Sequence, residues 1–65
     1  MREKREIEQE IRSIGQEIHS MEMSLFYLEM KDKWDHADYD EADHIRERIK
    51  KLKEEIDAKR EALRE

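Results

Sequence analysis

The sequence predicts an all-α protein, an antiparallel two-helix coiled-coil hairpin that dimerises into a four-helix bundle. Charged residues make up 51% of the 65 residues and proline is absent, a composition typical of coiled coils and long helices. Apolar residues recur at alternating steps of four and three along two stretches, which is the spacing of a heptad seam. Residues 1–65 are therefore expected to form one hairpin domain. Disorder, the alternative at this charge content, is disfavoured by the strict spacing.

The first helix is expected over about 3–32. Its seam follows the steps of four and three without a break and consists of Ile7, Ile11, Ile14, Ile18, Met21, Leu25 and Leu28. Asp32 takes the next seam position, so the apolar pattern, and with it the helix, is expected to stop there.

The turn is expected at about 33–35, where the sequence carries the signals of a new helix. Asp35 is placed to cap that helix, and Asp38, three residues later, completes a capping box. Trp34 and Tyr39 occupy the two hydrophobic-staple positions around the same cap. One continuous helix is the alternative, because neither glycine nor proline interrupts this stretch.

The second helix is expected over about 36–63. Its seam consists of Ala42, Ile45, Ile49, Leu52, Ile56 and Leu63, with Lys59 at the remaining position. In an antiparallel pair the facing positions add to a constant, and a sum of 70 pairs every apolar seam residue of one helix with a seam residue of the other, from Leu28 with Ala42 to Ile7 with Leu63. Along one edge of this seam the glutamates of the first helix face arginines and lysines of the second, which selects the antiparallel orientation.

A second apolar face lies on the first helix, away from the seam. Its members follow helical spacing and are Met23, Phe26, Tyr27, Met30 and Trp34. The second helix carries no matching stripe. Because a lone hairpin would leave these side chains exposed together, they are expected to form an oligomer or partner interface.

A second copy of the chain is the first expected partner of this face. Two antiparallel copies of the first helix with facing positions that add to 53 would set Phe26 against Tyr27 and Met23 against Met30, a self-complementary contact that predicts a homodimer. Two alternatives remain: the face binds a different protein, or Trp34 and Phe26 fold back over the turn as a small core.

Acidic residues gather around the turn and form a second candidate surface for a partner. They are Asp32, Asp35, Asp38, Asp40, Glu41 and Asp43. Carboxylates favour a helix start, which accounts for part of the cluster. The rest is consistent either with a solvated face or with an acidic knob that docks on a basic surface.

Catalysis has no support in the sequence, and no enzyme activity, cofactor or metal site is expected. The chain has no nucleophile–base set and no glycine-rich phosphate loop. Glu41 and His44 have the Glu-x-x-His spacing of di-iron bundles, but their register places them beside the seam rather than inside it. A small-ligand site between protomers is an alternative, although no residue pattern selects the ligand.

Nucleic acid is a disfavoured partner. The chain is similar to the plasmid RNA regulator ROP in size and general architecture, without a shared motif, and a ROP-like RNA-binding hairpin dimer is therefore an alternative function. The net charge of −5, from 14 basic and 19 acidic residues, works against it.

The expected location and function of the protein follow from the same features. With no apolar segment that could serve as a signal peptide or cross a membrane, and no cysteine, a cytoplasmic location is expected. The sequence thus predicts a small non-catalytic protein–protein interaction module, a regulator, inhibitor or assembly adaptor, that acts as a homo-oligomeric helical hairpin.

Overall fold

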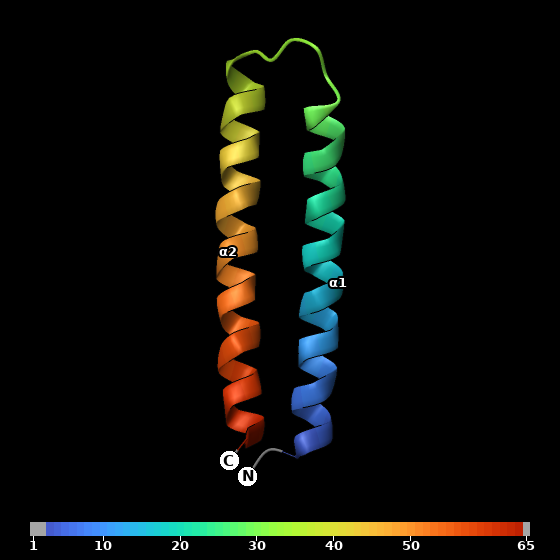
Figure 1. Cartoon of the computed structure of the whole chain (residues 1–65), viewed down its shortest axis with the longest axis vertical. Helices are drawn as coiled ribbons and strands as arrows, with labels where there is room; N and C mark the ends of the chain where they lie inside the picture. Colours follow the sequence, from blue (N-terminus) through green and yellow to red (C-terminus); the bar gives the residue numbers. More distant parts are fainter. Residues whose placement is uncertain (1–2, 65) are drawn as a thin grey trace.

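The protein is a pair of antiparallel helices joined by a short loop (Figure 1). The computed structural model describes residues 3–64, so Met1, Arg2 and Glu65 of the predicted domain lie outside it. Helix α1 spans Lys4–Glu29 and α2 spans His36–Arg64, and the two pack along their lengths. The all-helical, two-helix architecture is therefore confirmed. In the described part of the chain, neither helix is long and apolar enough to cross a lipid bilayer.

The core is the predicted seam, and α2 is buried more completely than α1. Five seam residues of α2 are buried, namely Ala42, Ile45, Ile49, Leu52 and Ile56, but only Ile18 and Leu28 of α1. Ile11, Ile14, Met21 and Leu25 of α1 pack against this cluster and remain partly exposed. The α1 side of the seam is thus only partly covered by α2.

Ion pairs between the helices agree with the predicted register. Lys59 pairs with Glu10 at 2.8 Å, Arg48 with Glu17 at 3.4 Å, and Arg46 with Glu29 at 3.9 Å. These position numbers add to 69, 65 and 75, which bracket the sum of 70 that the seam requires. The amine of Lys59, at a seam position, is thus neutralised by a carboxylate from the facing helix.

Helix α1 ends at Glu29, three residues before the predicted end at 32. The Met30 amide donates to the carbonyls of Phe26 and Tyr27, and the Lys31 amide to that of Leu28. The Trp34 indole also donates to the Leu28 carbonyl, at 2.7 Å. The carbonyls of Tyr27 and Leu28, which a longer helix would pair with the amides of residues 31 and 32, are satisfied in this way, and the chain leaves the helix and turns over the end of the seam.

The start of α2 has the predicted cap. The Asp38 amide donates to Oδ1 of Asp35 at 3.0 Å, and the Asp35 amide donates back to Oδ2 of Asp38 at 3.1 Å. The staple residues Trp34 and Tyr39 meet edge to face, with ring centroids 5.0 Å apart. Both the capping box and the staple are therefore confirmed, and the continuous-helix alternative is wrong.

Candidate interaction surface

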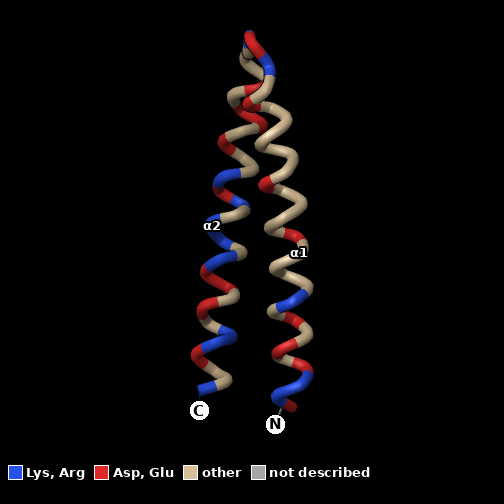
Figure 2. The backbone as a smooth tube through the Cα atoms, turned by 45° about the vertical axis from the view of Figure 1, so that its right-hand side comes forward, with Lys and Arg blue, Asp and Glu red and all other residues tan. Residues whose placement is uncertain are grey.

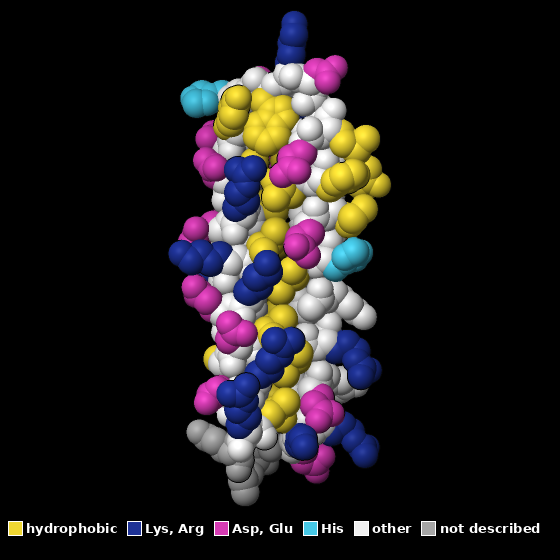
Figure 3. All heavy atoms as spheres, in the orientation of Figure 1, with side chains coloured by type: hydrophobic (Ala, Val, Ile, Leu, Met, Phe, Trp, Pro, Cys, Tyr) yellow, Lys and Arg dark blue, Asp and Glu magenta, His cyan; other side chains and the backbone are white. Residues whose placement is uncertain are grey.

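The outer face of α1 carries four large apolar side chains in the open. The exposed fractions are 40% for Met23, 53% for Phe26, 63% for Tyr27 and 64% for Met30. In the space-filling view they form a cluster on the side of α1 that points away from α2 (Figure 3). These four residues are called the outer patch below. An exposed cluster of this kind is typical of an interaction surface.

The face that carries the outer patch is also free of formal charge for about five helical turns. From Ser13 to Met30 its remaining members, at helical spacing, are Gln16, His19 and Ser20. The outer face of α2 is the opposite case, with Asp43, Glu47, Lys50 and Glu54 among its exposed residues. The backbone view shows the same contrast, because uncharged segments dominate the loop-side half of α1 while charged residues recur along α2 (Figure 2). The outer face of α2 is thus suited to contact with solvent, whereas the outer face of α1 is not.

Trp34 lies apart from the outer patch, although the sequence placed it on the same helical face. It lies in the loop rather than on α1, is partly buried, and packs against the core cluster. The early end of α1 is the cause, because it turns the chain toward α2 before residue 34. The alternative of a small core over the turn is therefore correct for Trp34 and wrong for Phe26, which stays exposed.

The acidic cluster at the turn is smaller than predicted, because Asp38 is withdrawn from it. Asp38 is 8% exposed and accepts the Lys31 amine at 2.9 and 3.0 Å. This amine, and secondly the Asp35 backbone N–H, hold the pKa of the Asp38 carboxyl below its usual range. The same contact raises the pKa of the Lys31 amine. The members of the cluster that stay exposed are Asp32, Asp35, Asp40, Glu41 and Asp43.

A shallow groove runs between the helices beside the outer patch. Near the loop it forms a hollow of about 370 Å³ whose floor includes Leu25 and Ile49 and whose α1 wall includes Phe26. A second hollow of about 350 Å³ continues it toward the chain ends, over Ile18 and Ile56. Figure 3 shows this face as a continuous apolar stripe between the helices. The heptad spacing predicts the seam, but it does not predict that the α1 side of the seam stays open.

Charged residues of opposite sign border this groove. Glu22 and Glu29 stand on the α1 edge, and Arg46, Lys53 and Arg60 follow one another at intervals of seven on the α2 edge, where Asp57 also borders the second hollow. Arg46 reaches Glu29 at 3.9 Å, with both side chains more than half exposed. Among the described residues, Lys53 and Arg60 have no carboxylate within 4.0 Å. This side of the hairpin, with its two charged edges, is called the groove face below.

Gly15 continues the α1 edge, one heptad before Glu22, and opens it. A Cβ placed on Gly15 would meet no atom of α2 or of any described side chain beyond its neighbours within 4 Å. No close approach inside this chain therefore requires the glycine. Its effect is to leave the backbone of α1 accessible on the groove face.

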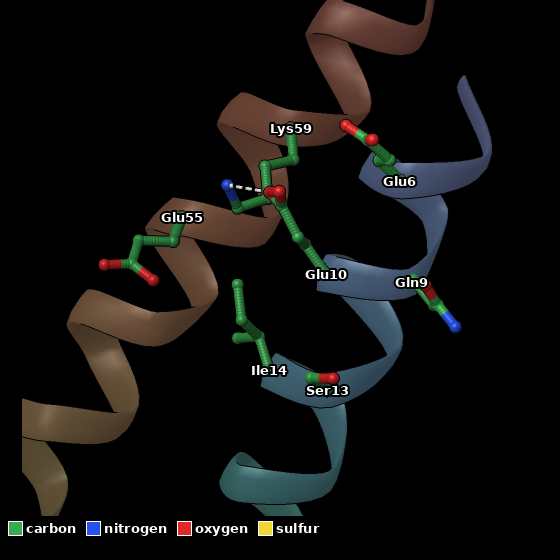
Figure 4. Close-up of a pocket in the computed structure, with 7 residues that line it drawn as sticks. All are labelled: Glu6, Gln9, Glu10, Ser13, Ile14, Glu55 and Lys59. Atoms are coloured by element: carbon green, nitrogen blue, oxygen red, sulfur yellow. Dashed lines mark hydrogen bonds and ion pairs between the residues drawn. The ribbon is translucent and has the colours of Figure 1, made fainter. Parts of the chain in front are cut away.

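On the opposite side of the hairpin, a hollow of about 620 Å³ lies near the chain ends. Its lining includes Ile14, Ser13 and Glu55, and the side chains of Glu10 and Lys59 meet across it (Figure 4). Their 2.8 Å ion pair engages the amine and one of the carboxylates of this lining, and the remaining polar side chains do not select a ligand. The geometry therefore gives no specific support to a small-ligand site here.

Residues 3–64 contain no cluster of side chains that could hold a metal ion. No three His, Asp or Glu side chains of this part of the chain lie close enough together to hold an ion. Comparison with known protein families, with curated proteins and with solved structures finds no match for this chain. A function for this chain is therefore inferred from the surfaces described above.

Proposed function

We propose that this chain is a small, non-catalytic protein–protein interaction module, a regulator, inhibitor or assembly adaptor, that acts as a homo-oligomeric helical hairpin. The observation that carries the proposal is the outer patch. Four apolar side chains that are 40–64% exposed stand together on a chain in which about half of the residues are charged. Aromatic residues and methionine are the residue types enriched in the cores of protein interfaces.

The thin core supports the oligomeric part of the proposal. Two helices enclose a single seam, and its α1 side is left partly exposed. Scaffolds of this size commonly gain the missing stability by association with further chains. A second copy that covered these residues would remove apolar area from water at roughly 25 cal/mol per Å².

The acidic residues of the turn offer a second, separate contact. Five carboxylates there remain exposed, while the Lys31 amine is bound by Asp38. A basic surface of a partner protein is the complementary shape and charge for this end of the rod. This contact would add specificity and speed of association rather than most of the affinity.

Light scattering over a concentration series tests the oligomeric state directly. We expect the wild-type chain to have the mass of two chains and to keep it on moderate dilution. Phe26 borders both the outer patch and the groove face, so Phe26→Asp is expected to reduce the mass to one chain while helicity by circular dichroism is kept.

The matched control is Ala58→Asp, which adds the same charge on the exposed outer face of α2. It should leave the mass unchanged. A wild-type monomer at all concentrations would contradict the homo-oligomer. An unchanged mass of the Phe26→Asp chain would exclude the surface around Phe26 as the contact.

A further inference from the structure

The homo-oligomer has two candidate contact surfaces on either side of Phe26, and the outer patch alone is small. Buried aromatic side chains contribute about 150–250 Å² each, so four half-exposed apolar side chains offer on the order of 400–500 Å² per chain. A two-fold contact through them alone would bury roughly 800–1,000 Å², below the range of about 1,200–2,000 Å² for stable interfaces.

The groove face is large enough. The molecule measures 49 × 14 × 13 Å, so a whole long face, of which the groove face is one and the outer face of α1 another, offers on the order of 700 Å² per copy. Two copies would together bury about 1,400 Å², which falls within the range of stable interfaces. It also contains the side chain of Leu25, which α2 leaves partly exposed above the buried Ile49.

We propose that a second copy of this chain packs on the groove face with its long axis parallel, so that α1 of each copy lies over α2 of the other. This inference rests on the proposed homo-oligomer and names the face and the orientation that it uses. The contact is isologous, with a two-fold axis parallel to the rods and both loops at the same end.

Charge selects this orientation over the other two-fold arrangement. With the axes parallel, Glu22 and Glu29 of each copy face Arg46 and Lys53 of the other, so these edge contacts join opposite charges, while Asp57 lies beside Lys53 and Arg60 on the α2 edge. If one copy is turned end over end, α1 lies over α1 and α2 over α2. Acidic edges then meet acidic edges and basic edges meet basic ones, which costs association energy.

The cations of the α2 edge support the same arrangement. Lys53 and Arg60 have no carboxylate within 4.0 Å in the described chain, whereas Arg46 pairs with Glu29 at 3.9 Å and with Asp43 of its own helix at 3.8 Å. In the parallel dimer Lys53 gains the partner copy's Glu22, and Arg60 lies against the open α1 edge at the partner copy's Gly15. The outer residues of the patch, Tyr27 and Met30, remain on the outside of this bundle and stay open to a different protein.

Charge-swapped chains test the inference. One variant carries Glu22→Lys and Glu29→Lys, a second carries Arg46→Glu and Lys53→Glu, and a third carries all four substitutions. Each doubly substituted chain, when it is alone, places like charges on both edges of its own dimer. We therefore expect its dimerisation, measured by light scattering, to be at least tenfold weaker. An equimolar mixture of the two restores opposite charges on both edges and should return to the mass of two chains.

The chain with all four substitutions controls for effects inside the hairpin, because it restores opposite charges both within and between chains. It should be a dimer. If the doubly substituted chains lose their helicity when each is alone, recovery of helicity on mixing supports the proposal and no recovery overturns it. A double substitution of the outer patch, Tyr27→Asp with Met30→Asp, should leave the dimer intact.

The two proposals fail in different ways. A wild-type monomer removes the homo-oligomer and this inference together. If the wild type is a dimer but the doubly substituted chains dimerise as strongly as the wild type, or their mixture stays monomeric, the groove face alone is overturned as the contact. Loss of the dimer in the outer-patch variant, with charge-swapped chains unaffected, would place the second copy on the outer patch instead.

Discussion

The loop end and the open end of the hairpin are built from the same kind of seam but are secured very differently. At the loop end Ala42 is fully buried and Leu28 is 9% exposed, and Trp34 covers them from the loop. The capping box and the Lys31–Asp38 ion pair fix the chain reversal beside them. Polar and apolar contacts therefore converge within a short stretch of sequence.

At the open end the seam is diluted. Ile7 and Leu63 are only partly buried, and Lys59 takes a seam position with its amine bound by Glu10. The difference teaches that a regular heptad spacing sets the register along the whole rod, whereas local stability depends on what covers the seam.

Ile49→Asp should remove the contrast altogether by unfolding both ends. Ile49 is 8% exposed in the middle of the seam, so the substitution buries a carboxylate without a partner and costs at least about 4 kcal/mol. Circular dichroism should show loss of most helicity at 25 °C. Ala58→Asp, at an exposed position of α2, should keep the helicity of the wild type. If the Ile49 variant also kept its helicity and melting temperature, the seam would be disproved.

The same substitution at the two ends should have unequal effects. Leu28→Ala removes a buried side chain at the loop end and should cost about 3 kcal/mol. Leu63→Ala, at the partly buried open end, should cost about 1 kcal/mol or less. Urea unfolding of the two variants measures both values. Equal costs would show that the two ends are equally secured.

Removal of the helix cap should weaken the loop end by a smaller amount. Asp35→Ala deletes the acceptor of the Asp38 amide and should cost about 1 kcal/mol, read as a lower melting temperature. Asp35→Asn keeps an acceptor at the same place and serves as the control. A cost in the Asn variant as large as in the Ala variant would point to charge rather than to the cap.

Acid should loosen the loop end first. The pKa of Asp38 is lowered in the folded chain, so its contribution to stability is present above the unfolded pKa of about 3.9 and is lost as the pH falls through the lower folded pKa. The pKa of Lys31 is raised, so its contribution is lost only above about pH 10.4. Melting temperatures of the wild type and of Asp38→Asn should therefore converge below about pH 4.

Local spacing explains why the seam, the cap and the staple were predictable. Each depends on residues a few positions apart, and Asp35, Asp38, Trp34 and Tyr39 all take their predicted places. The end of α1 was not predictable in the same way, because neither glycine nor proline marks it and the bond from Trp34 to the Leu28 carbonyl is tertiary. One signal was present: the staple role of Trp34 already places it outside α1.

The candidate surface was predicted in part. Met23, Phe26, Tyr27 and Met30 take their places on one exposed face, because a single helix fixes their spacing. The bond of Asp38 to Lys31 was missed, since it joins residues on both sides of the loop. The open α1 side of the groove was also missed, because the extent to which one helix covers another depends on side-chain sizes across the pair.

The convergence of contacts at the loop also has a kinetic consequence. Helices α1 and α2 are separated by six residues, and closure of such a short loop takes well under a microsecond. In the predicted register Leu28 and Ala42 are 14 positions apart, whereas Ile7 and Leu63 are 56 apart. Pairing should therefore begin at the loop and propagate to the chain ends. Because the loop end is also the more completely buried, backbone amides beside the loop should exchange their hydrogens last and those of residues 4–14 first.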